Sequence, residues 1–263
     1  MSRPLEALPP SSPPEAVTPE NLYEPNTQAL LRRLTRERRE AVALATGTMV
    51  QYYGEEVAAV RKAEEAAALR AMPPGYAIER LNGLNVGCGD RPIDAALLGI
   101  DAHTGTWSLG DGASFTSLAH LRGWAGDLPF KPATIDFLVA LHVLEHEPDP
   151  VATVRHWLDV VKPGGGVGIV VPDWRYTWDA RHDRDLWSHR WNPTPDLVRS
   201  LHARHWSQVA VLEQIDTIPF KLSFDVVLRK QGTFVAFDEQ PPASRPTGYE
   251  LHCRNKFVQE EAA

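Results

Sequence analysis

The sequence predicts an α/β fold in which helices cover both faces of a mainly parallel sheet. From residue 84 onward, short apolar runs alternate with segments of helical spacing, which is the pattern of such folds. Residues 167–171 form a continuous Val/Ile-rich run of the kind that is buried on both faces. Ligands of these sheets bind at the carboxyl ends of the strands, so we expect the functional residues directly after the strands.

The predicted elements follow one another at short intervals after residue 84. Lys162-Pro163-Gly164-Gly165 is expected to end the second helix, and Thr194 to cap the third one, with Pro195 in its first turn. The predicted strands are 84–86, 97–101, 135–141, 167–171, 209–215 and 224–228, and the predicted helices are 114–121, 149–161 and 194–205.

The regions on either side of this pattern differ from it in composition. Residues 1–25 contain seven prolines and are predicted to be a disordered tail. Residues 26–76 have helical spacing that ends at Met72-Pro73-Pro74-Gly75, and they are predicted to form an N-terminal helical cap. The main domain is expected over 77–235, with a lid insertion at 173–193, and 236–263 is expected to be a C-terminal tail.

The overall composition predicts a cytoplasmic protein with neither a nucleic acid nor a membrane as partner. The chain has 43% hydrophobic residues, 23% charged residues and a net charge of −7, and an acidic balance disfavours binding to a phosphate backbone. No stretch approaches the ~20 apolar residues that span a bilayer, and the N-terminus lacks the apolar core of a signal peptide. Cys88 and Cys253 are too few for a disulfide framework.

The first predicted strand runs into a glycine turn, Gly87-Cys88-Gly89. Such a turn lets backbone N–H groups approach a ligand closely. The next strand ends in Asp101, whose carboxylate can accept hydrogen bonds from ribose hydroxyls. Only 14 positions separate Gly87 from Asp101, against about 20 in a dinucleotide-binding unit. The first crossover helix is therefore predicted to be very short or missing, which argues against a nicotinamide cofactor.

Three more signals follow, namely residues 125–130 (Ala-Gly-Asp-Leu-Pro-Phe), 135–146 and 161–166. With the two above, in this order, they resemble class I S-adenosylmethionine-dependent methyltransferases over residues 84–173. The resemblance implies a Rossmann-like, mainly parallel seven-stranded sheet with S-adenosylmethionine as cofactor. The residues that it implies for cofactor binding are Gly87, Gly89, Asp101, Asp127 and Leu128. Cys88 and Leu141 complete the predicted cofactor-binding set.

Residues 173–191 mix Trp with Asp, Arg and His directly after a strand. This composition suits a saccharide, and the segment resembles sugar O-methyltransferases such as those that modify mycobacterial methylmannose polysaccharides. The acceptor is thus expected to be a small molecule or an oligosaccharide, with a phenol or an amine as the alternatives. A homodimer is also left open. Alternatively, the Trp residues anchor a lid to the core. The predicted substrate-binding residues are Asp173, Tyr176, Trp178, His182, His189 and Trp191.

A hydroxyl acceptor needs a base that takes its proton. His142, at the carboxyl end of strand 135–141, and His146 are the predicted catalytic residues. Mg²⁺ is compatible with the oxygen ligands that this region offers, and these are Glu145, Asp149 and Asp173.

Two other classes of protein match part of the pattern. Residues 142–146 have the H-x-x-E-H spacing of one class of zinc peptidase, in which both histidines lie on one helix; here the first histidine ends a strand-like run. A methyltransferase-like domain that binds the cofactor without catalysis is the second alternative, and the intact set of cofactor motifs argues against it.

Overall fold

The computed structural model describes residues 54–89, 91, 93–94, 96–103, 105–108, 114–117, 119–177, 179–181, 189–218 and 222–236. The predicted tail 1–25, the helical stretch up to residue 53 and the tail from residue 237 lie outside these residues. No helix in the described part combines the length and the apolar character that crossing a membrane requires.

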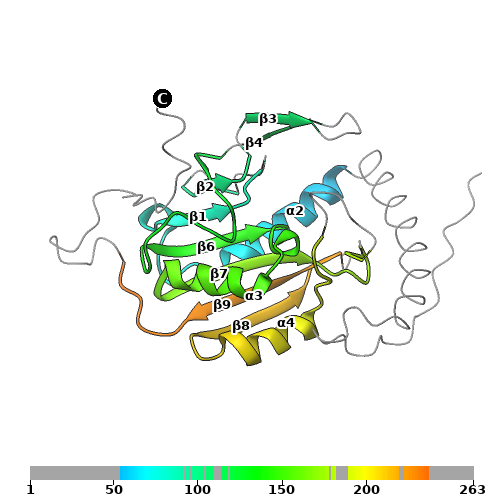
Figure 1. Ribbon diagram of the computed structural model, residues 1–263. Coiled ribbons are helices and arrows are strands. Elements are labelled where there is room, and N and C mark those ends of the chain that lie inside the picture. Colours follow the sequence, from blue (N-terminus) through cyan, green and yellow to red (C-terminus); the bar gives the residue numbers. More distant parts are fainter. Residues whose placement is uncertain are drawn as a thin grey trace, which may run out of the picture.

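A seven-stranded sheet forms the centre of the molecule, in the order β5-β2-β1-β6-β7-β9-β8 (Figure 1). β9 runs antiparallel to β7 and β8, and the pairs β5/β2, β2/β1, β1/β6 and β6/β7 are parallel. The prediction of a Rossmann-like, mainly parallel seven-stranded sheet is confirmed. The strands are β1 (Gly83–Val86), β2 (Leu98–Asp101), β5 (Leu121–Arg122), β6 (Ile135–Leu141), β7 (Val161–Pro172), β8 (Ala210–Thr217) and β9 (Ser223–Lys230).

The strand order reverses at β1, which pairs with β2 on one side and with β6 on the other. Val86 is level with Ile100 of β2 and with Ala140 of β6. The next residue of each strand, Gly87, Asp101 or Leu141, therefore lies at the same edge of the sheet. Such a reversal point is where doubly wound sheets bind ligands.

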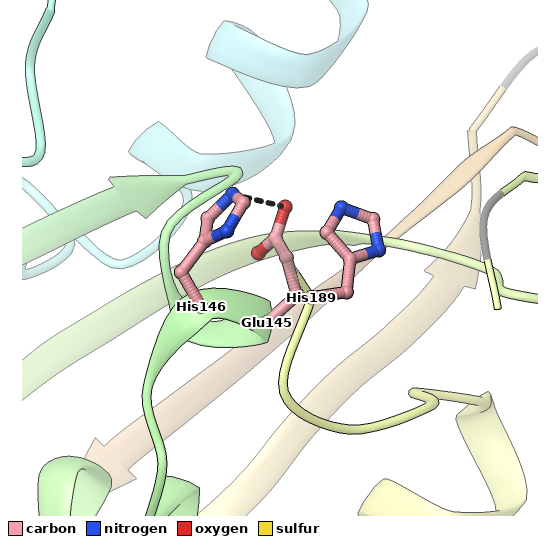
Figure 2. A group of neighbouring side chains, drawn as sticks. All are labelled: Glu145, His146 and His189. Atoms are coloured by element: carbon pink, nitrogen blue, oxygen red, sulfur yellow. Dashed lines mark ion pairs between the residues drawn. The ribbon is translucent and has the colours of Figure 1, made fainter. Parts of the chain in front are cut away.

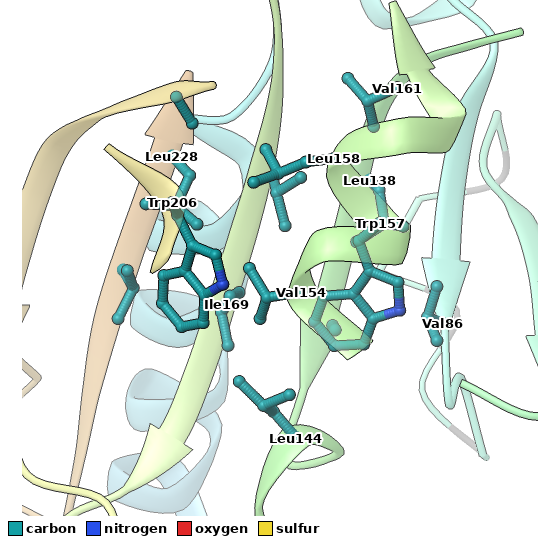
Figure 3. Close-up of a cluster of buried hydrophobic side chains, with 14 of the residues drawn as sticks. Val86, Leu138, Leu144, Val154, Trp157, Leu158, Val161, Ile169, Trp206 and Leu228 are labelled. Carbon is teal, nitrogen blue, oxygen red and sulfur yellow. The ribbon is translucent and has the colours of Figure 1, made fainter. Parts of the chain in front are cut away.

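One face of the sheet is covered by α3 (Pro150–Val160) and α4 (Pro195–Leu201) (Figure 1). Thr194 caps α4 through the Leu197 N–H, as the sequence predicted. Asp149 caps α3 by accepting a hydrogen bond from the Ala152 N–H. A π-helical turn, η3 (His202–Trp206), follows α4. Figure 3 shows how Trp157 and Trp206 fill the space between these helices and the sheet.

The other face is covered by α2 (Gly54–Leu69), followed by the short helix η1 (Ile78–Arg80). Ala68 and Ala71 are completely buried, and their carbonyl groups lie against glycines of β7. A Cβ atom at Gly168 would be 2.1 Å from the Ala68 oxygen, and one at Gly166 would be 2.2 Å from the Ala71 oxygen. The helix therefore approaches the strand at a distance that only glycine permits.

Two predicted elements differ in the structure. The predicted helix 114–121 is wrong, because Ser114–Ser117 is a strand, β4, that pairs antiparallel with β3 (Gly105–Ser108), and β5 follows. Pairing with the strand that precedes it in the sequence overrides the weak helical spacing of this segment. The predicted turn at 162–165 is part of β7, where a register shift opposite Ile135 and Phe137 accommodates the extra residues. The missing first crossover helix is confirmed over the described residues between β1 and β2.

The close approach of α2 to β7 gives a test of the fold. Gly168→Ala is expected to lower the free energy of unfolding by about 1–3 kcal/mol, the usual cost of overpacking a core, because α2 must move away from the strand. Val211→Ala, at a half-exposed position on β8, is the control and should change stability by less than about 0.5 kcal/mol. Urea denaturation of both variants measures this, and equal stability of the two would contradict the packing described.

Candidate functional site

The turn after β1 has the backbone conformation that the sequence predicted from its glycines. Gly87 and Gly89 have positive φ angles of 63° and 48°, a region that disfavours residues with a Cβ atom. A Cβ atom on Gly87 would lie 2.2 Å from Cγ2 of Val143, so this turn packs directly against the turn after β6. A Cβ atom on Gly89 would meet no atom of the described residues within 4 Å, apart from its neighbours in the chain.

The carboxylate of Asp101 lies beside this turn. Its Oδ2 accepts a hydrogen bond from the Gly89 N–H at 2.8 Å, and its Oδ1 accepts one from the His103 N–H at 2.9 Å. A carboxylate has about four acceptor positions, so Asp101 keeps capacity for two ribose hydroxyls. Asp101 and the glycine turn thus fit the nucleoside part of S-adenosylmethionine.

The other predicted cofactor residues lie around the same edge. The loop that carries Asp127 is attached to the end of β2 by a hydrogen bond from the Gly123 N–H to the Asp101 carbonyl at 2.8 Å. Asp127 itself is exposed. The side chains of Leu128 and Leu141 are buried in the two cores. Burial, and after it the charge of Asp101, raises the pKa of the Cys88 thiol to about 12, so Cys88 is a neutral packing residue.

His142 lies directly after β6 with a φ of 56°, an uncommon conformation for a residue other than glycine. Its Nε2 is 2.9 Å from Oε1 of Glu64, and its Nδ1 is 3.6 Å from Oε1 of Glu145. Burial lowers the pKa of His142, but the hydrogen bonds and charges of Glu145 and Glu64 outweigh this effect and raise the pKa to about 10. His142 is therefore a cation at neutral pH, a state that does not support the predicted role of proton acceptor.

Glu64 of α2 is a site residue that the sequence analysis missed. It is 5% exposed, and its carboxylate also accepts hydrogen bonds from Ser223 Oγ and from Nη1 of Arg91, both at 2.8 Å. Burial raises its pKa, but the contacts with His142 and Arg91 lower it to about 2. Helical spacing from Ala67, Ala68 and Ala71 places Glu64 on the buried face of α2, and this was the available signal.

A second group of side chains lies beside His142. Glu145 and His146 belong to the short helix η2 (Leu144–His146), and His189 precedes α4. Figure 2 shows the Glu145 carboxylate between the two imidazole rings. One potential ligand atom from each residue lies within 4.8 Å of the other two. Burial raises the pKa of Glu145, but His142 above all, and then His146 and His189, lower it overall.

Residues 189–191 are fixed to η2 by two hydrogen bonds. The Arg190 N–H donates to the Glu145 carbonyl at 2.7 Å, and Nε1 of Trp191 donates to the Leu144 carbonyl at 2.7 Å. Trp191 is 6% exposed and belongs to the core, which matches the anchoring alternative for this residue. His189 is thereby held opposite Glu145.

The remaining predicted residues are distributed as follows. Both carboxylate oxygens of Asp173 are bonded to Arg175, at 2.8 and 2.5 Å, and Arg175 also stacks on Tyr176. Asp149 is occupied as the cap of α3, so Glu145 alone among the three predicted metal-binding acids lies in the group with His146 and His189. Trp178 and His182 lie outside the described residues.

Comparisons with known proteins agree with this arrangement. Residues 84–169 match the protein family described as a methyltransferase domain. The ubiquinone biosynthesis O-methyltransferase of Nitrosospira multiformis is 30% identical over 95 residues, which are 32% of this chain and 40% of that protein. The match thus spans well under half the length of this curated relative.

Solved methyltransferase structures are also similar to the chain. A chain from the complex of the Haloferax volcanii Trm112 methyltransferase activator with a methyltransferase is 15% identical, with a TM-score of 0.47, over 76% of this chain and 98% of that chain. An S-adenosylmethionine-dependent methyltransferase from Mesorhizobium loti is 13% identical, with a TM-score of 0.46, over 64% and 98%. The fold assignment itself rests on the strand order.

The buried carboxylate of Glu64 gives a test of the site. Glu64→Ala leaves Arg91 and His142 without their shared partner. It is expected to lower the free energy of unfolding by about 3 kcal/mol, the lower end of the range for a broken buried pair. The lower end applies because 39% of the His142 side chain is exposed. The control is Glu65→Ala, since Glu65 also pairs with Arg91 at 2.8 Å but is more exposed; it should cost less than about 1 kcal/mol. Denaturant titration that finds equal losses for the two would show that Glu64 is not the central contact.

Proposed function

We propose that this protein is an S-adenosylmethionine-dependent methyltransferase that methylates a hydroxyl oxygen of its acceptor. The observation that carries the proposal is the position of Asp101, hydrogen-bonded to Gly89 of the glycine turn, at the point where the strand order reverses. The methyltransferase-domain match over residues 84–169 supports it. The choice of oxygen is supported by the relative described as an O-methyltransferase.

S-adenosylmethionine supplies, when bound, an electrophilic methyl group on a sulfonium centre. Asp101 would bind the ribose hydroxyls, and the backbone of Gly87 and Gly89 would lie under the rest of the cofactor. Asp127, exposed on the loop that is tied to the end of β2, would border the adenine ring. His142 follows the central strand β6, next to this edge, where an acceptor would meet the methyl group.

His142 has a positioning role in this proposal. As an imidazolium it donates to Glu64 and faces Glu145, so it fixes both carboxylates but has no lone pair with which to accept the proton of a hydroxyl. The saccharide acceptor stays a prediction from the composition of residues 173–191. Asp173 is bonded to Arg175 and Trp191 belongs to the core. Of the described residues in that set, we propose Tyr176 and His189 as contacts of an acceptor.

The cofactor assignment predicts that S-adenosylhomocysteine binds and that Asp101 is needed for it. At a hundred times its Kd the ligand should add about 2.7 kcal/mol to the stability of the fold, whereas NADH should add nothing. Asp101→Ala should weaken binding about 10- to 150-fold, which corresponds to a lost charge-assisted hydrogen bond of about 1.5–3 kcal/mol.

The matched control is Asp94→Ala, because Asp94 lies in the same crossover and its Oδ1 accepts a hydrogen bond from the nearby Ala96 N–H. Calorimetric titration compares the three proteins. A Kd that is the same for the wild type and Asp101→Ala would show that another residue binds the ribose, and stabilisation by NADH instead of S-adenosylhomocysteine would refute the cofactor.

The acceptor assignment predicts methyl transfer to hydroxyl groups. A panel of saccharides, phenols and amines is incubated with the protein and S-adenosylmethionine that carries a labelled methyl group, and the label in each product is measured. Transfer to hydroxyl-bearing compounds is expected, with the saccharides testing the composition of residues 173–191. Transfer to amines alone would overturn the choice of oxygen, and cofactor binding without transfer to any compound would favour the non-catalytic alternative.

A further inference from the structure

We propose that Glu145, His146 and His189 form a binding site for one divalent transition-metal cation, of which Zn²⁺ is the probe we would use. The site lies beside His142, at the carboxyl end of β6. Binding of the ion does not depend on the proposed methyltransferase function; only its catalytic consequence rests on that function.

The first argument is the geometry of the donors. The three ligand atoms lie within 4.8 Å of one another, and Nε2 of His146 is 3.9 Å from Oε1 of Glu145. The two imidazole rings are 5.1 Å apart between their centroids and inclined at 73° (Figure 2). Zinc–ligand bonds of about 2.0–2.2 Å require neighbouring donors to lie somewhat closer than this. The side chain of His146 is 37% exposed, which leaves its ring free to move inward.

The second argument is a buried atom that lacks a partner. Glu145 is 1% exposed, and its Oε2 is completely buried without a hydrogen bond from any described residue. The Nδ1 atom of His146 is in the same state. A buried carboxylate oxygen is normally bonded, because an unsatisfied one pays the full desolvation penalty of a charged group. A cation at this position would satisfy the Glu145 oxygen.

The third argument is that the site is held in place by its surroundings. The hydrogen bonds of Arg190 and Trp191 to the carbonyls of η2 fix His189 against Glu145. On the opposite side, His142 faces Oε1 of Glu145, so a residue outside the group orients the carboxylate, as is usual around metal ligands. Glu145 and His189 are thus held in place before any ion binds.

The donor set selects the class of ion. Two imidazoles and one carboxylate are the protein ligands of many catalytic zinc sites, and imidazole also suits iron, nickel and copper. Mg²⁺ prefers oxygen ligands, so it fits this group less well than the oxygen-only set of acids that the sequence analysis considered. Three protein ligands leave at least one position open for water or for a hydroxyl of the acceptor.

The open position has a consequence for methyl transfer. A cation lowers the pKa of an oxygen bound to it, so an acceptor hydroxyl on the ion would release its proton to solvent without a histidine base. The oxygen would then form a bond to the methyl carbon of the cofactor while the carbon–sulfur bond breaks and its electron pair stays on sulfur.

The experiment uses the full chain, freed of metal with a chelator that is then removed. Calorimetric titration with Zn²⁺, Mn²⁺ and Mg²⁺ measures stoichiometry and affinity for the wild type, His146→Ala, His189→Ala and Glu145→Gln. The control is His205→Ala, because His205 is an exposed histidine on η3. The chain has ten histidines, so the dependence on these particular residues is what identifies the site.

We expect one Zn²⁺ per chain in the wild type and in His205→Ala, with weaker binding of Mg²⁺. Mutation of residues that only contact the metal ligands typically lowers metal affinity about 10–100-fold. Loss of a ligand itself, His146 or His189, should therefore weaken Zn²⁺ binding by at least about 10-fold. Glu145→Gln should do the same if it folds, and the partly exposed His146 provides the test if it does not. Equal affinity in His146→Ala and the wild type, or no saturable binding, would overturn the site.

A parallel measurement separates this proposal from the proposed function. Binding of S-adenosylhomocysteine is measured in the metal-free protein, where it should be retained. If the nucleoside binds and Zn²⁺ does not, the metal site is wrong and the cofactor assignment stands. If Zn²⁺ binds and the nucleoside does not, the metal site stands and the methyltransferase function is wrong.

Discussion

The buried carboxylate of Glu64 is the contact on which the rest of the site depends. A charge in this position costs several kcal/mol unless it is paired and hydrogen-bonded, and it is paired with Arg91 and His142 and bonded to Ser223. These partners come from the loop after β1, the end of β6 and the start of β9. The carboxylate is therefore satisfied only when α2 and three parts of the sheet are assembled together.

Two glycines of β7 allow this carboxylate to reach the site. Gly166 and Gly168 let the backbone of α2 lie directly on the strand, and Arg229 of β9 donates hydrogen bonds to the carbonyls of Arg70 and Ala71 just beyond the end of the helix. A helix held further out would leave the Glu64 side chain short of His142. The close packing of α2 on the sheet is thus required for the ion pairs of the site.

The same network joins the two halves of the site. His142 connects Glu64 to Glu145, and the carbonyls of Glu145 and Leu144 hold residues 190 and 191 in turn. The cofactor half depends mainly on backbone shape at Gly87 and Gly89. The part around His142 and Glu145 depends on side chains that shift one another's pKa.

The sequence by itself determined what is encoded within a few neighbouring residues. Strand and helix periods, the cap at Thr194, the glycine turn and Asp101 at a strand end could all be predicted, because their cause is local. Only the tertiary structure decided the contact of Glu64 with His142, which lie 78 positions apart, and the meeting of His189 with Glu145. Such pairings determine which charges are buried, so they also decided that His142 is a cation and that Trp191 is an anchor. The physical reason is that burial and distance between remote residues, unlike periodicity, are properties of the folded chain.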